Sequence, residues 1–283
     1  MGVVAFVVVL GCASCTMLAS WGYFRHYQIS RPPIGVFTLT DIVLMLLMVI
    51  LVPLLYLVLP LWLVVCLLGL AVVSILSATW QPVLRVRGAN WVVTLVLLAA
   101  DLGTALLFGT ASGVFFAINN AVLIVVVVGI TNLWVQSGLK ARDAALLAVL
   151  LAAYDGIATA ALPLMASLYT RLIGLPLAPT LAWGSSGMSL GIGLGDVLLA
   201  TVFPLVMRKA FGRRAGIVAL VLALCAIGAL LALPLRGLFP AMVVLGPLML
   251  LQYLWWSRLR GRERTMWQYL QQKPTGRKVR KPA

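Results

Sequence analysis

Four of the six acidic residues in this 283-residue chain lie within or beside long apolar runs, where a carboxylate is costly. On insertion scales an ionisable side chain in the centre of a membrane helix costs on the order of 2.5–3.5 kcal/mol, so each one is a candidate functional group. The four residues are Asp41, Asp101, Asp155 and Asp196. Asp41 is the weakest candidate, because it follows Thr38 and Thr40 near a helix start and could serve there as a cap.

Asp155 and Asp196 together could activate a water molecule for peptide hydrolysis. Two carboxylates in contact share one proton, since both cannot ionise cheaply. The ionised partner takes a proton from water, and the protonated partner polarises the peptide carbonyl. This chemistry needs no metal and no other cofactor. The only histidine, His26, argues against Ser–His chemistry and against a metalloprotease, which needs several ligands.

The elements that must position this pair are membrane helices. With 63% hydrophobic and only 10% charged residues, the composition excludes a soluble globular protein. Runs such as 121–130 are apolar on every face, unlike the alternating strands of a membrane barrel. We expect an all-α, polytopic membrane domain at 1–257, with its catalytic half at 144–257, and a basic cytoplasmic tail at 258–283. The nine expected transmembrane helices cover residues 3–23, 37–58, 60–80, 91–109, 113–135, 144–166, 187–207, 215–235 and 238–257.

The depth of the two aspartates predicts that they meet. The sixth expected span begins at position 144 and the seventh ends at position 207, so Asp155 and Asp196 are equally far from these two span ends. The spans are consecutive and antiparallel, so both ends are at the same membrane face. At about 1.5 Å per residue, both carboxylates lie about 16 Å from that face. Gly191, Gly193 and Gly195 precede Asp196 and allow a neighbouring helix to approach closely.

The basic residues predict the orientation. Of the 21 Lys and Arg residues, 19 fall on one side of the expected membrane, and only Arg171 and Arg236 fall on the other. Cytoplasmic loops carry such an excess, so the N-terminus is expected to be extracytoplasmic and the C-terminus cytoplasmic. This distribution accounts for the net charge of +15 without a nucleic-acid partner. The lipid bilayer is the expected partner instead.

Three short motifs occur in order on the sixth, seventh and ninth expected spans. They are Tyr154-Asp155, Gly193-Leu194-Gly195-Asp196 and Pro240-Ala241-Met242. The chain therefore resembles the presenilin and signal peptide peptidase family of intramembrane aspartyl proteases, which is marked by Y-D, G-x-G-D and P-A-L on those spans. Met242 stands where the family has leucine. The expected orientation is similar to that of signal peptide peptidase and opposite to that of presenilin.

The resemblance implies hydrolysis of peptide bonds within transmembrane segments, including remnant signal peptides, with Asp155 and Asp196 as the catalytic pair. The substrate would be a transmembrane peptide or a membrane protein. In the family, substrate pairs as a strand near the loop between the sixth and seventh spans and near the P-A-L segment. Residues 167–186 correspond to that loop, and we expect them either to supply such pairing or to be a plain connector.

Other interpretations remain open at this point. The glycines before Asp196 could simply pack helices. The type IV prepilin peptidase family also has G-x-G-D, but its motif is usually followed by lysine, whereas Val197, Leu198 and Leu199 follow here. A transporter or channel could use the intramembrane aspartates as a proton or cation path, with Asn119 and Asn120. A noncatalytic membrane scaffold is the third alternative.

Overall fold

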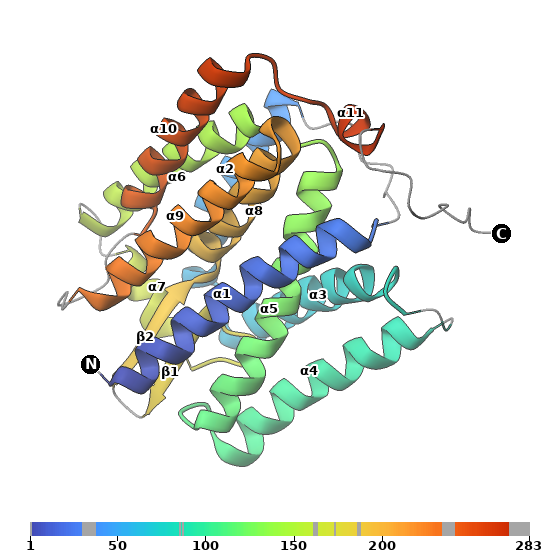
Figure 1. The fold of residues 1–283 in the computed structure, drawn as a ribbon. Helices are drawn as coiled ribbons and strands as arrows, with labels where there is room; N and C mark the ends of the chain where they lie inside the picture. Colours follow the sequence, from blue (N-terminus) through green and yellow to red (C-terminus); the bar gives the residue numbers. More distant parts are fainter. Residues whose placement is uncertain are drawn as a thin grey trace.

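The structure is a computed structural model in which helices dominate (Figure 1). It describes residues 2–29, 38–84, 86, 88–160, 164–172, 174–185, 188–233 and 241–271. Within these residues there are eleven helices and one two-stranded sheet.

Nine of the helices in the described residues are long. They are α1 (Val3–His26), α2 (Leu39–Val58), α3 (Leu61–Trp80), α4 (Ala89–Phe108), α5 (Gly113–Gln136), α6 (Ala141–Ala160), α8 (Leu194–Phe211), α9 (Arg213–Ala232) and α10 (Met242–Arg260). Two helices are short, α7 (Leu164–Leu172) and α11 (Met266–Gln271). Each long helix coincides with an apolar run, because a helix satisfies its own backbone hydrogen bonds where water is absent.

Six helices in the described residues are long and apolar enough to cross a membrane: α1, α2, α3, α4, α5 and α9. The boundary between the second and third expected spans, which no charged residue marks, is at the predicted place. There α2 ends at Val58, and α3 begins at Leu61 after the extended Pro60. Helices α6, α8 and α10 have similar lengths but fall outside this set of six.

The expected span at 187–207 is wrong at its beginning. Met188–Gly193 forms the strand β2, which pairs antiparallel with β1 (Thr180–Ser185) in a register that joins Ala182 to Gly191. The helix α8 begins only at Leu194. Alternate glycines lower helix propensity and allow close backbone approach, so this apolar run becomes a strand. The expected connector at 167–186 likewise contains ordered elements, the end of α7 and the strand β1.

The closest helix packing involves α6, α8, α9 and α10 (Figure 1). Helix α10 runs along α6, where a side chain at Gly246 would come within 2.6 Å of the Ala148 carbonyl oxygen. Only glycine fits there, as at many helix contacts in membranes. Helix α8 is the central element, because nearly all of its residues from Val197 to Phe211 are buried. By contrast, α2 exposes most of its apolar side chains.

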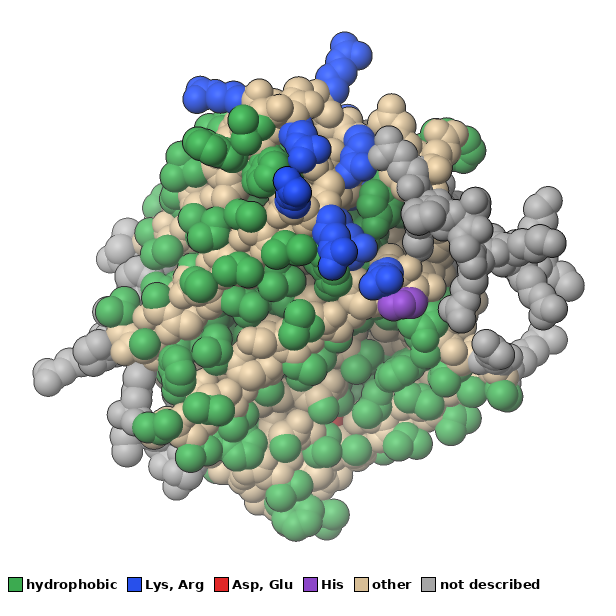
Figure 2. All heavy atoms as spheres, in the orientation of Figure 1, with side chains coloured by type: hydrophobic (Ala, Val, Ile, Leu, Met, Phe, Trp, Pro, Cys, Tyr) green, Lys and Arg blue, Asp and Glu red, His purple; other side chains and the backbone are tan. Residues whose placement is uncertain are grey.

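The surface separates by chemistry. Figure 2 shows Lys and Arg side chains gathered toward one end of the molecule, while hydrophobic side chains spread over most of the remaining face. Exposed Val, Leu and Trp side chains on α2 and α4 belong to this apolar surface. A broad apolar surface with a basic rim fits a protein embedded in lipid.

The predicted tail at 258–283 begins within α10, which continues to Arg260. The chain then turns back at Gly261, and residues up to Gln271 lie against the ends of other helices. Tyr269 of α11 stacks on Phe24 of α1 with ring centroids 5.3 Å apart. This part of the tail is therefore a docked segment.

Candidate functional site

Asp155 and Asp196 come from different helices and are neighbours in the folded protein. Asp155 lies in the second half of α6, and Asp196 is the third residue of α8. They are close enough that the charge of Asp155 acts directly on the Asp196 carboxyl group. Both residues are half-buried. The structure therefore brings the second half of α6 and the first turn of α8 together at these two residues.

The third motif lies against the first. The backbone N–H of Met242 lies close to the Asp155 carboxylate. Met242 is the first residue of α10, and Ala241 is its N-cap with no side-chain cap. A carboxylate at a helix N-terminus satisfies an orphan N–H group and interacts favourably with the helix dipole. Asp155 therefore also acts as a cap for α10. Pro240, the first residue of this motif, lies outside the described residues.

The glycines of the second motif have different roles. A β-carbon at Gly193 would lie 3.3 Å from Oδ2 of Asp196, which is tighter than ordinary van der Waals contact. A β-carbon at Gly195 would meet nothing within 4 Å. Leu194, between them, fixes the start of α8 because its N–H bonds to the Pro179 carbonyl at 3.0 Å. Gly193 is therefore the glycine whose missing side chain makes room for the carboxylate.

Both carboxylates lie at helix N-termini, and the pair of residues Tyr154 and Asp155 also has unpaired polar atoms. Asp196 is in the first turn of α8, and Asp155 faces the first N–H group of α10. Each helix end stabilises negative charge. Within the described residues, Oδ2 of Asp155 and the hydroxyl of Tyr154 are buried without hydrogen-bond partners. Buried polar atoms normally have partners, so unpaired ones often mark sites that take water or a ligand.

Asp101, in α4, does not join this site. Its side chain is fully buried, and Oδ2 accepts a hydrogen bond of 2.8 Å from the backbone N–H of Leu177. Leu177 has a φ of +59°, which is unfavourable for a residue with a side chain. The Asp101 carboxylate thus helps to hold the connector that leads to β1.

Asn119 and Asn120 of α5 hold the same connector. Asn119 donates to the Ala178 carbonyl at 3.2 Å. Asn120 forms two bonds with Ala182 of β1, donating to its carbonyl at 2.9 Å and accepting from its N–H at 3.1 Å. Its amide therefore pairs with β1 as a neighbouring strand would. Sequence reasoning missed this role because the partners are 59 and 62 residues away.

The remaining carboxylates have structural partners. As expected, Asp41 caps α2: its side chain accepts from the Thr38 N–H at 2.6 Å, in a complete capping box. Asp143 pairs with Arg142 at 3.1 Å. Glu263 accepts hydrogen bonds from the first N–H groups of α6. In the described part of the chain, no group of three or more His, Cys, Asp or Glu residues could hold a metal ion.

Six long apolar helices, with the apolar surface in Figure 2, define the chain as a multi-pass helical membrane protein. Comparison with models of known protein families gave no match, and comparison with curated proteins gave none. The likeness to a protease family therefore rests on the three motifs and on the geometry that joins them.

Proposed function

We propose that this protein is an intramembrane aspartyl protease of the presenilin and signal peptide peptidase type. The observation that carries the proposal is the meeting of three motifs that are distant in sequence. The charge of Asp155 acts on Asp196, and the N–H of Met242 lies close to Asp155. An unrelated helix bundle has no reason to bring Asp155, Asp196 and the start of α10 close together.

The chemistry follows from two carboxylates that share one proton. The ionised carboxylate removes a proton from a water molecule, whose oxygen attacks the substrate carbonyl. The protonated carboxyl group donates a hydrogen bond to that carbonyl and later supplies the proton for the leaving amine. The N-termini of α8 and α10 stabilise the single negative charge of the pair. Water enters as the second substrate, and the products are a new carboxylate and a new amine.

The two-stranded sheet of β1 and β2 gives this site a means of binding an unwound substrate. A transmembrane helix hides its peptide bonds, so the cleaved segment must become extended. Within the described residues, β2 pairs only with β1, and β2 leads directly into Gly193 and α8. The outer side of β1 is occupied at Ala182 by Asn120. The outer edge of β2 is therefore the favoured position for a substrate strand.

The proposal includes nine membrane-spanning helices, with α6, α8 and α10 completing the six identified by length and hydropathy. It also includes an extracytoplasmic N-terminus and a cytoplasmic C-terminus, supported by the uneven distribution of Lys and Arg. Strand pairing is directional, so the orientation of the enzyme selects the orientation of the substrate. We therefore propose substrates whose N-terminus is cytoplasmic, including remnant signal peptides.

The test is cleavage of a transmembrane peptide by the purified protein in liposomes. Matched reporters should carry the same span inserted in opposite directions. The proposal predicts preferential cleavage of the reporter with its N-terminus in the cytoplasm. Preference for the opposite reporter would reject the substrate orientation, and cleavage of neither reporter would reject the proposed function. The transporter alternative has less support, because Asp101, Asn119 and Asn120 are engaged with backbone groups of the connector.

A further inference from the structure

Two adjacent residues after α10, Glu263 and Arg264, contact the start of α6 and the last turn of α8. The Glu263 carboxylate accepts hydrogen bonds from the backbone N–H groups of Ala141 and Arg142, at 2.9 and 3.0 Å, at the start of α6. Tyr253 of α10 lies next to the same carboxylate.

Arg264 makes the complementary contacts on α8. Its backbone N–H and its Nε each donate to the Ala210 carbonyl at 3.2 Å, and its Nη2 donates to the Arg208 carbonyl at 3.2 Å. These carbonyls are in the last turn of α8, where helices leave acceptors unpaired. A carboxylate at a helix N-terminus and a guanidinium at a helix C-terminus both match the helix dipole. Each residue is therefore placed at the helix end that suits its charge.

The three helices that these residues join are the three that carry the candidate motifs. On α6, at about 1.5 Å rise per residue, Ala141 lies about 21 Å along the axis from Asp155. The same rise places Arg208 about 18 Å from Asp196 on α8, and Tyr253 about 16 Å from Met242 on α10. A helix transmits an axial shift at one end along its length. Glu263 and Arg264 follow α10 closely in the chain, so holding them on the ends of α6 and α8 limits sliding between the three motifs.

We infer that Glu263 and Arg264 form a clasp that sets the axial register of α6, α8 and α10, and that they are positioning residues for the candidate site. The expected effect of the clasp on cleavage rests on the proposed function. The existence of the clasp does not rest on it, because backbone amide exchange can detect the clasp in a protein without activity. The segment that the sequence presents as a plain basic tail thus becomes part of the catalytic unit.

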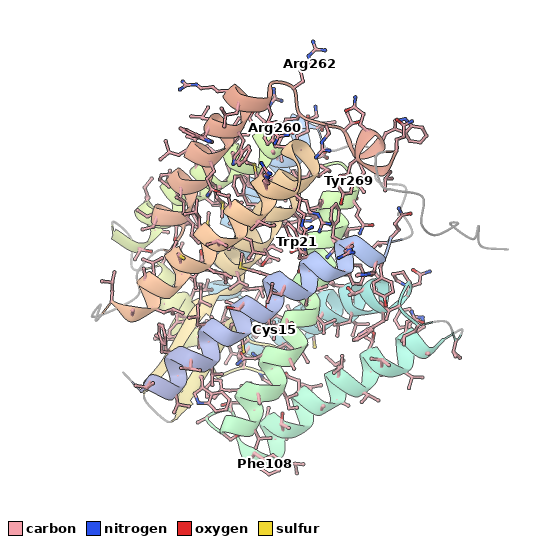
Figure 3. All side chains as sticks on the ribbon, viewed as in Figure 1. Cys15, Trp21, Phe108, Arg260, Arg262 and Tyr269 are labelled. Carbon is pink, nitrogen blue, oxygen red and sulfur yellow. The ribbon has the colours of Figure 1, made fainter. Side chains whose placement is uncertain are left out.

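The test compares variants that remove the clasp with variants that leave it intact. Glu263→Ala and truncation after Gly261 remove it. Arg262→Ala is the matched control, because Arg262 is exposed and extends away from the helices (Figure 3). Truncation after Gln271 is the second control, because it keeps both residues. Glu263→Gln, which keeps an acceptor for the α6 N–H groups, is the conservative variant for the case in which Glu263→Ala fails to fold.

Two measurements distinguish positioning from general stability. Amide hydrogen exchange at Ala141 and Arg142 should accelerate in Glu263→Ala and stay unchanged in both controls. The kcat for a transmembrane peptide should fall roughly tenfold to hundredfold with KM nearly constant, the effect expected when reacting groups are misplaced by about 1 Å. Glu263→Gln should recover part of this loss.

Unchanged exchange would overturn the clasp, and unchanged kcat with accelerated exchange would overturn its positioning role. An inactive wild type with the expected exchange pattern would reject the proposed function and leave the clasp standing.

Discussion

Asp101 and the pair formed by Asp155 and Asp196 are carboxylates within long helices, but their surroundings differ. Asp101 is fully buried, and its neighbours are the backbone of Leu177 and the connector that follows. Asp155 and Asp196 are half-buried, the charge of one acts on the other, and they lie beside two helix N-termini. The cost of a carboxylate inside a membrane protein therefore does not define its role. The neighbours of a carboxylate define its role. Asp101 supports an irregular backbone, whereas two carboxylates close together can share a proton.

The largest expected effect comes from removing either carboxylate of the pair. Asp155→Ala and Asp196→Ala should each lower the cleavage rate on the order of 10³-fold or more, since each removes an acid–base group. Thermal unfolding should show that both variants remain folded, because loss of a buried charge relieves desolvation. Asp155→Asn sharpens the test, because its amide oxygen can still accept from the Met242 N–H. Near-normal cleavage by Asp155→Asn would mean that Asp155 is only a helix cap.

The second expected effect distinguishes the two glycines next to Asp196. Gly193→Ala places a methyl group 3.3 Å from the Asp196 carboxylate and should lower kcat roughly tenfold by displacing it. Gly195→Ala is the matched control, because its methyl group enters open space and should leave kcat within about twofold of wild type. Peptide cleavage measured on both proteins, with their melting temperatures, checks the pair. If both variants are equally active, Gly193 does not set the carboxylate position.

For Asp101 we expect the reverse pattern, in which substitution lowers stability and leaves activity unchanged. Asp101→Ala leaves the buried Leu177 N–H without its acceptor and should lower the free energy of unfolding by about 1–3 kcal/mol. Cleavage per folded molecule should remain close to the wild-type value. Asp101→Asn keeps an acceptor oxygen and should lose less stability. Denaturant unfolding in detergent measures these differences, and an inactive yet stable Asp101→Asn would transfer the chemistry to α4.

The smallest expected effect is at Met242, where the chain departs from the family motif. Met242 is buried, and its contact with Asp155 is made through the backbone N–H. Met242→Leu preserves that N–H and nearly preserves side-chain volume, so it should cost less than about 1.5 kcal/mol in stability. Cleavage should be unchanged. Loss of activity in this variant, measured on folded protein, would mean that the third motif is misaligned.

Much of the helical framework could be predicted from sequence, because uninterrupted apolar runs leave the backbone few alternatives in lipid. The boundary at Pro60 and the cap at Asp41 were also predictable, since both depend on residues adjacent in the chain. The strand Met188–Gly193 was not predicted. Its residues are apolar and resemble the start of a membrane helix, and its strand conformation depends on pairing with Thr180–Ser185.

Some features of the candidate site could likewise be predicted from sequence, and others could not. The three motifs could be recognised in the sequence, and the spacing of Asp155 and Asp196 within their expected spans predicted that they would be neighbours. The approach of Met242 to Asp155 depends on how α10 packs against α6, which no local pattern specifies. The roles of Asn120 and Glu263 were missed for the same reason. Their partners are far away in the sequence, and each side chain bonds to backbone groups that carry no sequence signature.

We propose that Asp155 and Asp196 activate water to cut a peptide bond within a membrane-spanning segment. The most direct measurement is mass spectrometry of the products when a transmembrane peptide is incubated with the reconstituted protein in ¹⁸O-labelled water. We expect wild type to cut inside the span and to leave label in the new C-terminal carboxylate, and we expect no such product from Asp196→Ala. Labelled product at equal rates from both proteins, or no intramembrane cut by wild type, would contradict it.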